Sequence, residues 1–162
     1  MMDGKIIEFL KMTEDEFKEF SSYEKESYAK ELHKVFNAPL EEAYDKSNKT
    51  FETYLSNGLN SENNYLYSIT ETKNNTKVGT LWFLTRDNNG IKELLIASIR
   101  IFDEYQGKGY GKKAMSLIDN KALELDVDKI VLHVFGYNKT AISLYEKAGF
   151  EPFSVNMEKI LK

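Results

Sequence analysis

The sequence has no cysteine and only two histidines among its 162 residues. The absence of cysteine excludes disulfides, thiolate nucleophiles and thiolate metal sites. The two histidines, His33 and His133, are too few for a histidine-rich metal centre. The acidic residues show neither HExxH nor EF-hand spacing, so we expect no metal site.

Long apolar runs and an excess of positive charge are also missing. The longest apolar runs, such as residues 94–97, fall far short of the ~20 residues that a membrane span needs, so no membrane partner is expected. The N-terminus has no sustained apolar region with a small-residue cleavage site, which favours a cytoplasmic location. With 22 basic and 26 acidic residues, the net charge of −4 disfavours nucleic acid as a partner. Any anion site must therefore be local.

The length fits a single domain over residues 1–162 with one core. Its N-terminal part, about residues 1–62, is mainly helical by pattern. A capping box beginning at Thr13 predicts a first helix over about 14–36. A second helix is expected after the proline at 39, and it ends near Gly58.

From about residue 63 to residue 162 the pattern changes to a sheet-rich core. Three β-branched or aromatic runs separated by turn formers predict an antiparallel meander, and a glycine-rich stretch follows them. Together these elements predict an α+β fold with a central mixed, mostly antiparallel sheet flanked by helices. The predicted core elements are strands at 64–70, 77–84 and 93–102, a helix through 114–125, a strand at 129–135, a helix at 141–148 and a final strand at 153–161.

Three glycines, Gly107, Gly109 and Gly111, alternate with other residues just before the third predicted helix. Glycine permits positive φ angles and has no Cβ, so several backbone N–H groups can converge on one oxyanion. The start of the following helix adds partial positive charge, and neighbouring lysines add more. The stretch therefore predicts a phosphate or diphosphate site held mainly by backbone amides; a glycine-rich turn without a ligand is the alternative.

Two other phosphate-binding motifs fit this stretch poorly. A Walker loop needs GxxxxGK[ST], which begins neither at Gly107 nor at Gly109. The Rossmann pattern GxGxxG needs glycine where Lys112 stands, and it follows the first strand of a βαβ unit instead of a meander. Nucleoside triphosphate hydrolysis and dinucleotide binding are disfavoured, and an ordinary nucleotide binder stays a third possibility.

Residues 106–111, Gln-Gly-Lys-Gly-Tyr-Gly, resemble the (Gln/Arg)-x-x-Gly-x-(Gly/Ala) signature of the GNAT superfamily of N-acetyltransferases. Residues 138–150 are similar to its second signature, N-x-x-A-x-x-L-Y-x-x-x-G-F. With their flanks the two signatures cover about residues 93–153, and the helical N-terminal part resembles the family only in layout, as its substrate-facing part. Asp103 departs from the proline often found there, and we expect this to affect loop rigidity more than binding.

The resemblance implies a GNAT-like sheet whose splayed strands form an acetyl-CoA cleft, and an enzyme that moves acetyl directly to a primary amine of a small molecule or peptide. A non-catalytic acyl-CoA sensor or protein-interaction module is the alternative. In the family the glycine loop binds the pyrophosphate, and strand backbone binds the pantetheine arm and the acetyl oxygen. The coenzyme-binding residues implied in this way are Ile99, Ile101, Gln106, Gly107, Lys108, Gly109, Tyr110, Gly111, Lys112 and Asn138.

The resemblance also implies two catalytic candidates. Tyr145 corresponds to the tyrosine that protonates the coenzyme A thiolate, although its helical face could equally serve packing. His133 stands five residues before Asn138, where protein N-terminal acetyltransferases of the superfamily carry a glutamate base. It is a candidate general base, with packing in an apolar strand as the alternative.

The acceptor is not identified by these patterns. Acidic and aromatic residues of the N-terminal part could contact a cationic amine, although a glutamate-rich helix surface is usually just solvated. His33, on the predicted first helix, is expected to be structural, and Asn138 could also cap a helix. The oligomeric state is monomer or homodimer. The acidic and aromatic residues that could contact a cationic amine are Glu24, Glu31, Tyr28 and Tyr44.

Overall fold

The structure is a computed structural model that describes residue 4 and residues 6–162. The chain forms two compact units, Met1–Leu132 and His133–Lys162. Within the described residues, the first unit holds five strands and helices α1 to α3, and the second holds helix α4. Among the described residues, no helix is both long enough and apolar enough to cross a bilayer.

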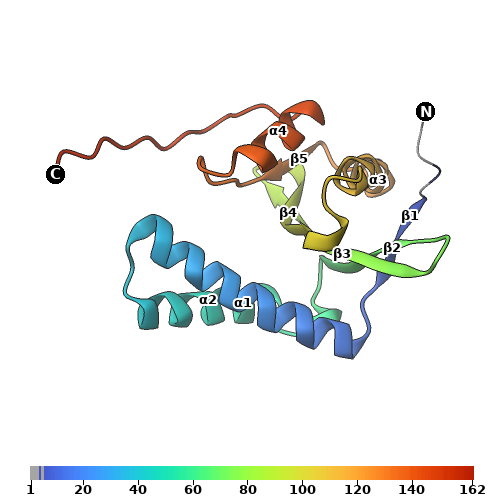
Figure 1. Cartoon of the computed structure of the whole chain (residues 1–162), viewed down its shortest axis with the longest axis horizontal. Helices are drawn as coiled ribbons and strands as arrows, with labels where there is room; N and C mark the ends of the chain where they lie inside the picture. The colour runs from blue at the N-terminus through green and yellow to red at the C-terminus, as the bar shows by residue number, and fades with distance from the viewer. Residues whose placement is uncertain (1–3, 5) are drawn as a thin grey trace. The chain divides into compact units, whose positions relative to one another are not determined.

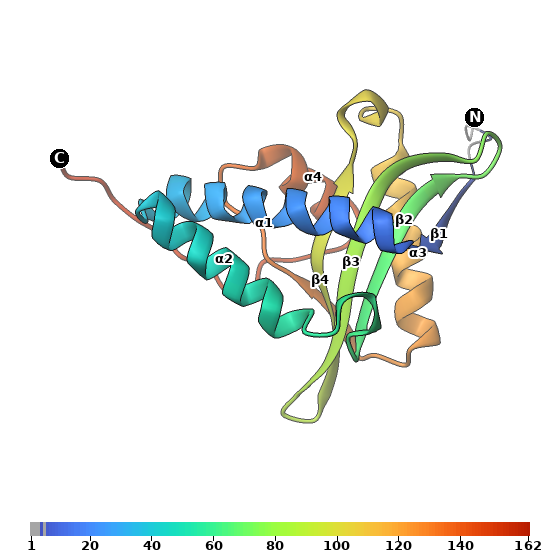
Figure 2. The ribbon, with the colours of Figure 1, turned by 90° about the horizontal axis from the view of Figure 1, so that it is seen from below.

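The strands form one mixed sheet in the order β1-β2-β3-β4-β5. The first four strands pair antiparallel with their neighbours, and β5 runs parallel to β4. This confirms the predicted mixed, mostly antiparallel sheet, which Figure 2 shows with β3 and β4 as long neighbouring ribbons. The strands are β1 (Ile7–Lys11), β2 (Asn64–Glu71), β3 (Thr76–Asn88), β4 (Ile91–Ile101) and β5 (Lys129–Leu132).

Helices cover both faces of the sheet, with α1 and α2 on one side and α3 on the other (Figure 1). The first helix begins as the sequence predicts, because Thr13 and Glu16 exchange the two hydrogen bonds of a capping box. The helices are α1 (Glu14–Phe36), α2 (Leu40–Tyr54), α3 (Tyr110–Glu124) and α4 (Lys139–Lys147), and two short 3-10 turns are η1 (Gly58–Asn60) and η2 (Asp103–Tyr105).

Trp82 of β3 lies at the centre of the core between the sheet and helices α1 and α2. The ring centroids of Phe20 and Phe51 lie 6.3 and 5.3 Å from that of Trp82. The indole N–H donates to the side-chain oxygen of Asn64 over 2.8 Å, so this buried donor is satisfied. The cluster fixes α1 and α2 against the sheet and therefore fixes which side chains of β4 face α1.

A β-bulge in β4 changes the direction of its second half. Trp82 pairs with Ser98 and Phe83 pairs with Ile96, so Ala97 is an extra residue on β4. Because Trp82 faces α1 and α2, its partner Ser98 faces them too. Arg100, two residues on, shares that face. The bulge therefore turns these two polar side chains toward α1.

Three sequence-based assignments of strands are incomplete or wrong. The strand β1 is not predicted, although Ile7 and Phe9 alternate with polar Glu8, because the pattern of the N-terminal part as a whole favours helices. The strand predicted over 129–135 ends at Leu132, so His133 follows the strand instead of lying within it.

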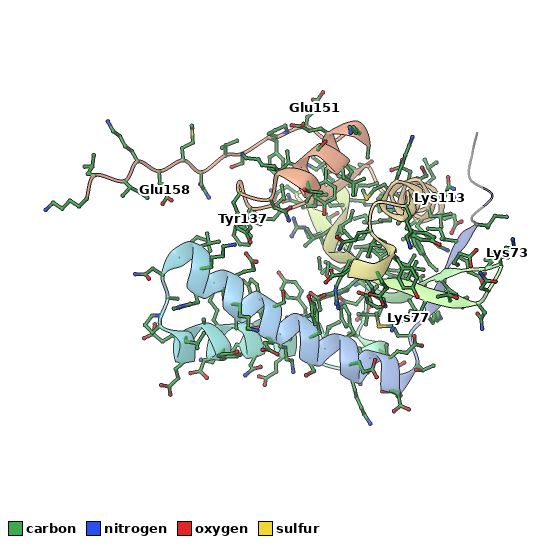
Figure 3. The ribbon with its side chains drawn as sticks, in the orientation of Figure 1. Lys73, Lys77, Lys113, Tyr137, Glu151 and Glu158 are labelled. Atoms are coloured by element: carbon green, nitrogen blue, oxygen red, sulfur yellow. The ribbon has the colours of Figure 1, made fainter. Side chains whose placement is uncertain are left out.

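The final strand predicted over 153–161 does not form. Residues 151–162 are extended, exposed and outside any strand, and Phe153 and Met157 are 82% and 92% exposed. Figure 3 draws this segment with Glu151 and Glu158 projecting from it. Alternation in a sequence indicates which face a strand could bury, but a strand also needs a neighbouring strand to pair with. Within the described residues of the second unit there is none.

Candidate active site

The glycine-rich stretch forms a loop that leads directly into α3. After η2 and Gln106, the residues Gly107 and Gly109 adopt φ angles of 71° and 86°, and Gly109 is the N-cap of α3. A residue with a side chain would pay about 1–2 kcal/mol for such an angle, which explains glycine at these two positions. The space where a Cβ would stand is open at both positions. A ligand can therefore approach the backbone of the loop closely.

The loop uses few of its own backbone donors. Gln106 N–H donates to the Asp103 carbonyl over 3.3 Å, and Lys113 N–H donates to the Gly109 carbonyl over 3.2 Å. Between them lie N–H groups that donate to no backbone carbonyl of the described residues, at the positive end of the α3 dipole. Lys113, labelled in Figure 3, belongs to the first turn of α3. These N–H groups belong to Gly107, Lys108, Gly109, Gly111 and Lys112.

In the second half of β4, the backbone N–H and C=O groups of successive residues point alternately toward β3 and toward the opposite edge of the strand. Phe102 N–H donates to the Val78 carbonyl of β3 over 2.9 Å, so the peptide groups of the preceding residue, Ile101, point to the opposite edge. The Ile101 carbonyl accepts from the side-chain amide of Gln106 over 2.9 Å on that edge. Ile99, two residues earlier, has the same orientation as Ile101. Its N–H and C=O therefore also point away from β3.

The edge of β4 that faces away from β3 is only partly covered by β5. The two strands pair from Glu93 with Lys129 to Ile96 with Leu132, where β5 ends. Beyond Ile96 no strand of the described residues pairs with this edge. The backbone groups of Ile99 therefore lie beyond the point where β4 and β5 stop pairing. A cleft between splayed strands is expected to begin at such a point.

Gln106 ties the glycine loop to this edge. Besides the Ile101 carbonyl, its side-chain amide also donates to the Asp103 carboxylate over 3.3 Å. The side chain of Gln106 thus holds the loop in place, and Asp103 assists it. That Asp103 affects the rigidity of the loop more than binding stays a prediction.

The remaining candidates, Asn138, Tyr145 and His133, belong to the second unit. The Asn138 side-chain oxygen accepts from Ala141 N–H over 3.2 Å, so its helix-capping role is confirmed. Burial raises the pKa of the Tyr145 phenol above its ordinary value, which already lies above neutral pH. His133 is exposed, and its ring lies 4.8 Å from that of Phe135. The catalytic and coenzyme roles of these three residues stay predictions.

The prediction that His33 is structural is supported by one contact. Its Nδ1 lies 2.8 Å from the Ala38 carbonyl oxygen, which can only accept, so Nδ1 carries the proton and donates. This bond ties the last turn of α1 to the connection that leads into α2.

A group of side chains between α1 and β4 is not recognisable as a unit from the sequence. The Arg100 guanidinium lies 3.6 Å from the ring centroid of Tyr23 and 4.9 Å from that of Phe102. Burial raises the pKa of the Glu24 carboxyl, against the lowering effects of the Ser98 hydroxyl and the Arg100 charge. In the sequence Glu24 is only one of four candidates, because the bulge that directs Ser98 and Arg100 toward it has no clear local signal.

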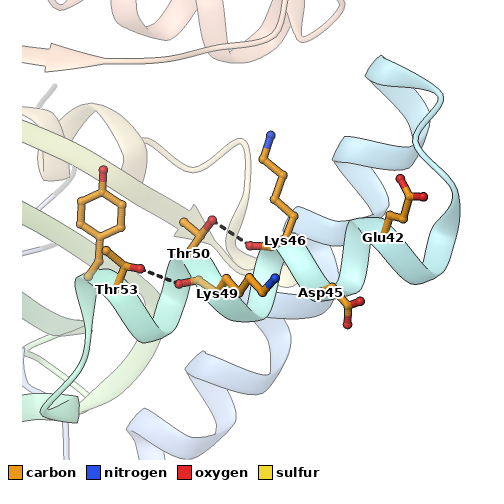
Figure 4. A pocket seen from close by; sticks show the side chains of 7 residues that line it. Glu42, Asp45, Lys46, Lys49, Thr50 and Thr53 are labelled. Carbon is orange, nitrogen blue, oxygen red and sulfur yellow. Dashed lines mark hydrogen bonds between the residues drawn. The ribbon is translucent and has the colours of Figure 1, made fainter.

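A shallow concavity of about 510 Å³ lies along α2 (Figure 4). Thr50 and Thr53 line it and donate to carbonyls of their own helix over 2.9 and 2.8 Å. It contains none of the residues predicted to bind coenzyme. In the described part of the chain, no three His, Cys, Asp or Glu side chains gather in a way that could hold a metal ion.

The chain is similar to known acetyltransferases over nearly its whole length. The sequence profile of the acetyltransferase (GNAT) family matches residues 29–150. The chain is 33% identical over 150 residues to the Bacillus subtilis (strain 168) protein named uncharacterized N-acetyltransferase YdgE, covering 93% of this chain and 95% of that one. It is 34% identical over 152 residues to uncharacterized N-acetyltransferase YycN of the same organism, covering 93% and 96%. The solved structure of the putative acetyltransferase YycN matches with a TM-score of 0.88 and 32% identity, covering 97% of this chain and 99% of that one.

Proposed function

Because the chain belongs to the acetyltransferase (GNAT) family and is an N-acetyltransferase, we propose that it transfers the acetyl group of acetyl-CoA directly to a primary amine of a small molecule or peptide. The observation that carries this proposal is the set of loop N–H groups, those of Gly107, Lys108, Gly109, Gly111 and Lys112, that donate to no backbone carbonyl of the described residues. They lie at the start of α3, in the loop that Gln106 links to the Ile101 carbonyl of β4.

The glycine loop fits a diphosphate in three respects. Its N–H groups are the kind of donor that binds phosphate oxygens, and the helix dipole of α3 adds favourable charge. The open space at Gly107 and Gly109 allows close approach. Exposed Lys108 and Lys112 supply charge without fixing the geometry. The loop, which Gln106 holds to β4, would therefore bind and aim the coenzyme through backbone.

The unpaired edge of β4 suits the acyl end of the cosubstrate. The Ile99 and Ile101 N–H groups point to this edge and can donate to the pantetheine arm and the acetyl oxygen. Acetyl-CoA supplies an acyl group activated by its thioester bond. A backbone donor at the acetyl oxygen favours attack there, because negative charge develops on that oxygen as the nitrogen adds.

Two further roles belong to the second unit. Tyr145 would return a proton to the coenzyme A thiolate, and its phenol, whose pKa burial raises, is protonated at neutral pH. His133 would accept a proton from the acceptor nitrogen, and its exposure leaves its ring open to solvent exchange. A single domain over 1–162, a cytoplasmic location and a monomeric or homodimeric state stay predictions.

The experiment that tests this proposal is the release of free thiol from acetyl-CoA in the presence of named amines: spermidine, L-lysine, tyramine and an alanine-initiated tripeptide. We expect thiol release that requires an amine, together with an acetylated product of +42 Da in mass spectrometry. Tight acetyl-CoA binding without thiol release would support the non-catalytic sensor instead. A thermal shift with ATP or NAD but none with coenzyme A would support an ordinary nucleotide binder.

A further inference from the structure

The side chains beside the unpaired edge of β4 belong to the group between α1 and β4 described above. Ser98 and Arg100 flank Ile99 in the chain, and both face α1 because of the bulge at Ala97. Figure 2 shows α1 running across β3 and β4, which agrees with the contacts between Tyr23 of α1 and Arg100 of β4. Glu24 follows Phe20 of α1 by one helical turn, and Phe20 packs against Trp82 of β3, so Glu24 lies on the face of α1 that meets the sheet.

The environment of Glu24 is unusual for a helix-surface carboxylate. Most glutamates of α1 are solvated or paired, such as Glu26, whose carboxylate lies 2.8 Å from Lys30 Nζ. Glu24 is partly buried, and the charged group whose field acts on it is Arg100, although the two do not approach within ion-pair distance. No charged group of α2 contributes among the described residues.

Arg100 contacts two aromatic rings. Its guanidinium stacks on the Tyr23 ring at 3.6 Å and lies 4.9 Å from the Phe102 ring. Held in this way, Arg100 lowers the pKa of Glu24 through its charge but leaves the carboxylate without a close cationic partner. A partly desolvated carboxylate of this kind attracts a cation and accepts a proton more readily than a solvated one.

We propose that Glu24 is the carboxylate that binds the ammonium form of the acceptor and takes its proton, with Ser98 and Arg100 positioning it beside Ile99. The acceptor is accordingly a cationic primary amine. This inference rests on the proposed acetyl transfer and adds to it the residue that receives the acceptor.

The proton and bond changes balance as follows. Glu24 takes one proton from the ammonium and leaves a neutral amine, whose nitrogen forms a bond to the acetyl carbon while the carbon–sulfur bond breaks. The nitrogen loses its second proton to water, and the departing thiolate gains one from water. Glu24 returns its proton to water, so each cycle releases one proton.

The test compares Glu24→Gln with the matched variant Glu26→Gln, which removes the same charge from the exposed face of the same helix. Steady-state rates with acetyl-CoA and the amine that the wild-type protein acetylates fastest are measured from pH 5 to pH 9. We expect Glu24→Gln to lower kcat/KM about 10²–10⁴-fold and to abolish the acid limb of the profile, with acetyl-CoA affinity unchanged. Glu26→Gln should match the wild-type protein, and Glu24→Asp should recover part of the activity.

Arg100→Gln gives a second readout, the pH of the acid limb, which would not change if Glu24 were only structural. Because the Arg100 charge lowers the pKa of Glu24, its removal should move the acid limb to higher pH. Equal activity and equal pH profiles for Glu24→Gln and Glu26→Gln would overturn the inference while leaving acetyl transfer intact. If the wild-type protein binds acetyl-CoA but acetylates none of the four amines, the proposed function fails and this inference falls with it.

Discussion

A glutamate at position 109 would place a negative charge where the account puts the diphosphate. Gly109 has a φ of 86° and open space where a Cβ would stand, so Gly109→Glu fits sterically but strains the backbone. Gly90, in the turn between β3 and β4, has a φ of 85° and equally open space. Gly90→Glu therefore introduces the same charge and the same strain of about 1–2 kcal/mol away from the loop.

The expected loss of affinity follows from Coulomb's law. A carboxylate about 5 Å from one phosphate charge is opposed by about 3 kcal/mol at an effective dielectric constant of ~20. This corresponds to a Kd for acetyl-CoA about 100-fold weaker in Gly109→Glu than in the wild-type protein, and the difference should shrink at high salt. Gly90→Glu should bind like the wild-type protein.

Calorimetric titration with acetyl-CoA measures the three Kd values, and thermal melting checks that both variants fold with similar stability. Gly109→Ala separates strain from charge, because it should lose less affinity than Gly109→Glu. Indistinguishable Kd values for Gly109→Glu and Gly90→Glu would refute the assignment of the loop.

Four further predictions concern catalysis and stability. Tyr145→Phe should lower turnover about 10²-fold or more with unchanged acetyl-CoA affinity in calorimetry, and undiminished turnover would remove it as the acid. His133→Ala should lose activity with an altered pH profile, whereas an unaltered profile would support packing alone. Folding lowers the pKa of Glu16 and Glu93 from 4.5 to about 2. At Glu16, burial raises the pKa, but hydrogen bonds from Ser68 and other groups lower it by more. At Glu93, the hydrogen bonds from Asn88 and Arg86 are the main cause of the lowered pKa. Their contribution to stability is complete above about pH 4.5 and is lost as the pH falls toward 2, so melting temperatures should drop across that range, and constant values would contradict it. Trp82→Ala should cost about 3–5 kcal/mol in urea unfolding, and a cost below 1 kcal/mol would contradict its central place in the core.

Strands β2 to β5 and helices α1 to α4 could be predicted because their signals are local. The capping box of Thr13 and Glu16 marked the start of α1, and β-rich runs with turn formers between them marked β2, β3 and β4. The first signature, which ends at Gly111, coincides with the loop and the start of α3.

Features that depend on pairing between distant segments were less accessible. The alternation in 153–161 does not reveal whether a partner strand exists, and none pairs with it in the described second unit. The bulge at Ala97 is visible only once β3 and β4 are aligned, and it decides that Ser98 and Arg100 meet α1. Glu24 could be named from the sequence as one acidic residue of several, but its distinct environment arises from that long-range contact.

The proposed diphosphate site consists of backbone N–H groups in the loop from Gly107 to Lys112, and these can be observed directly. The amide resonances of an ¹⁵N-labelled protein are followed while coenzyme A, or acetyl-pantetheine without its phosphates, is added. We predict that coenzyme A shifts the N–H signals of Gly107, Gly109 and Gly111 strongly downfield and that acetyl-pantetheine leaves them in place. Coenzyme A binding that leaves these three signals unmoved would contradict the account.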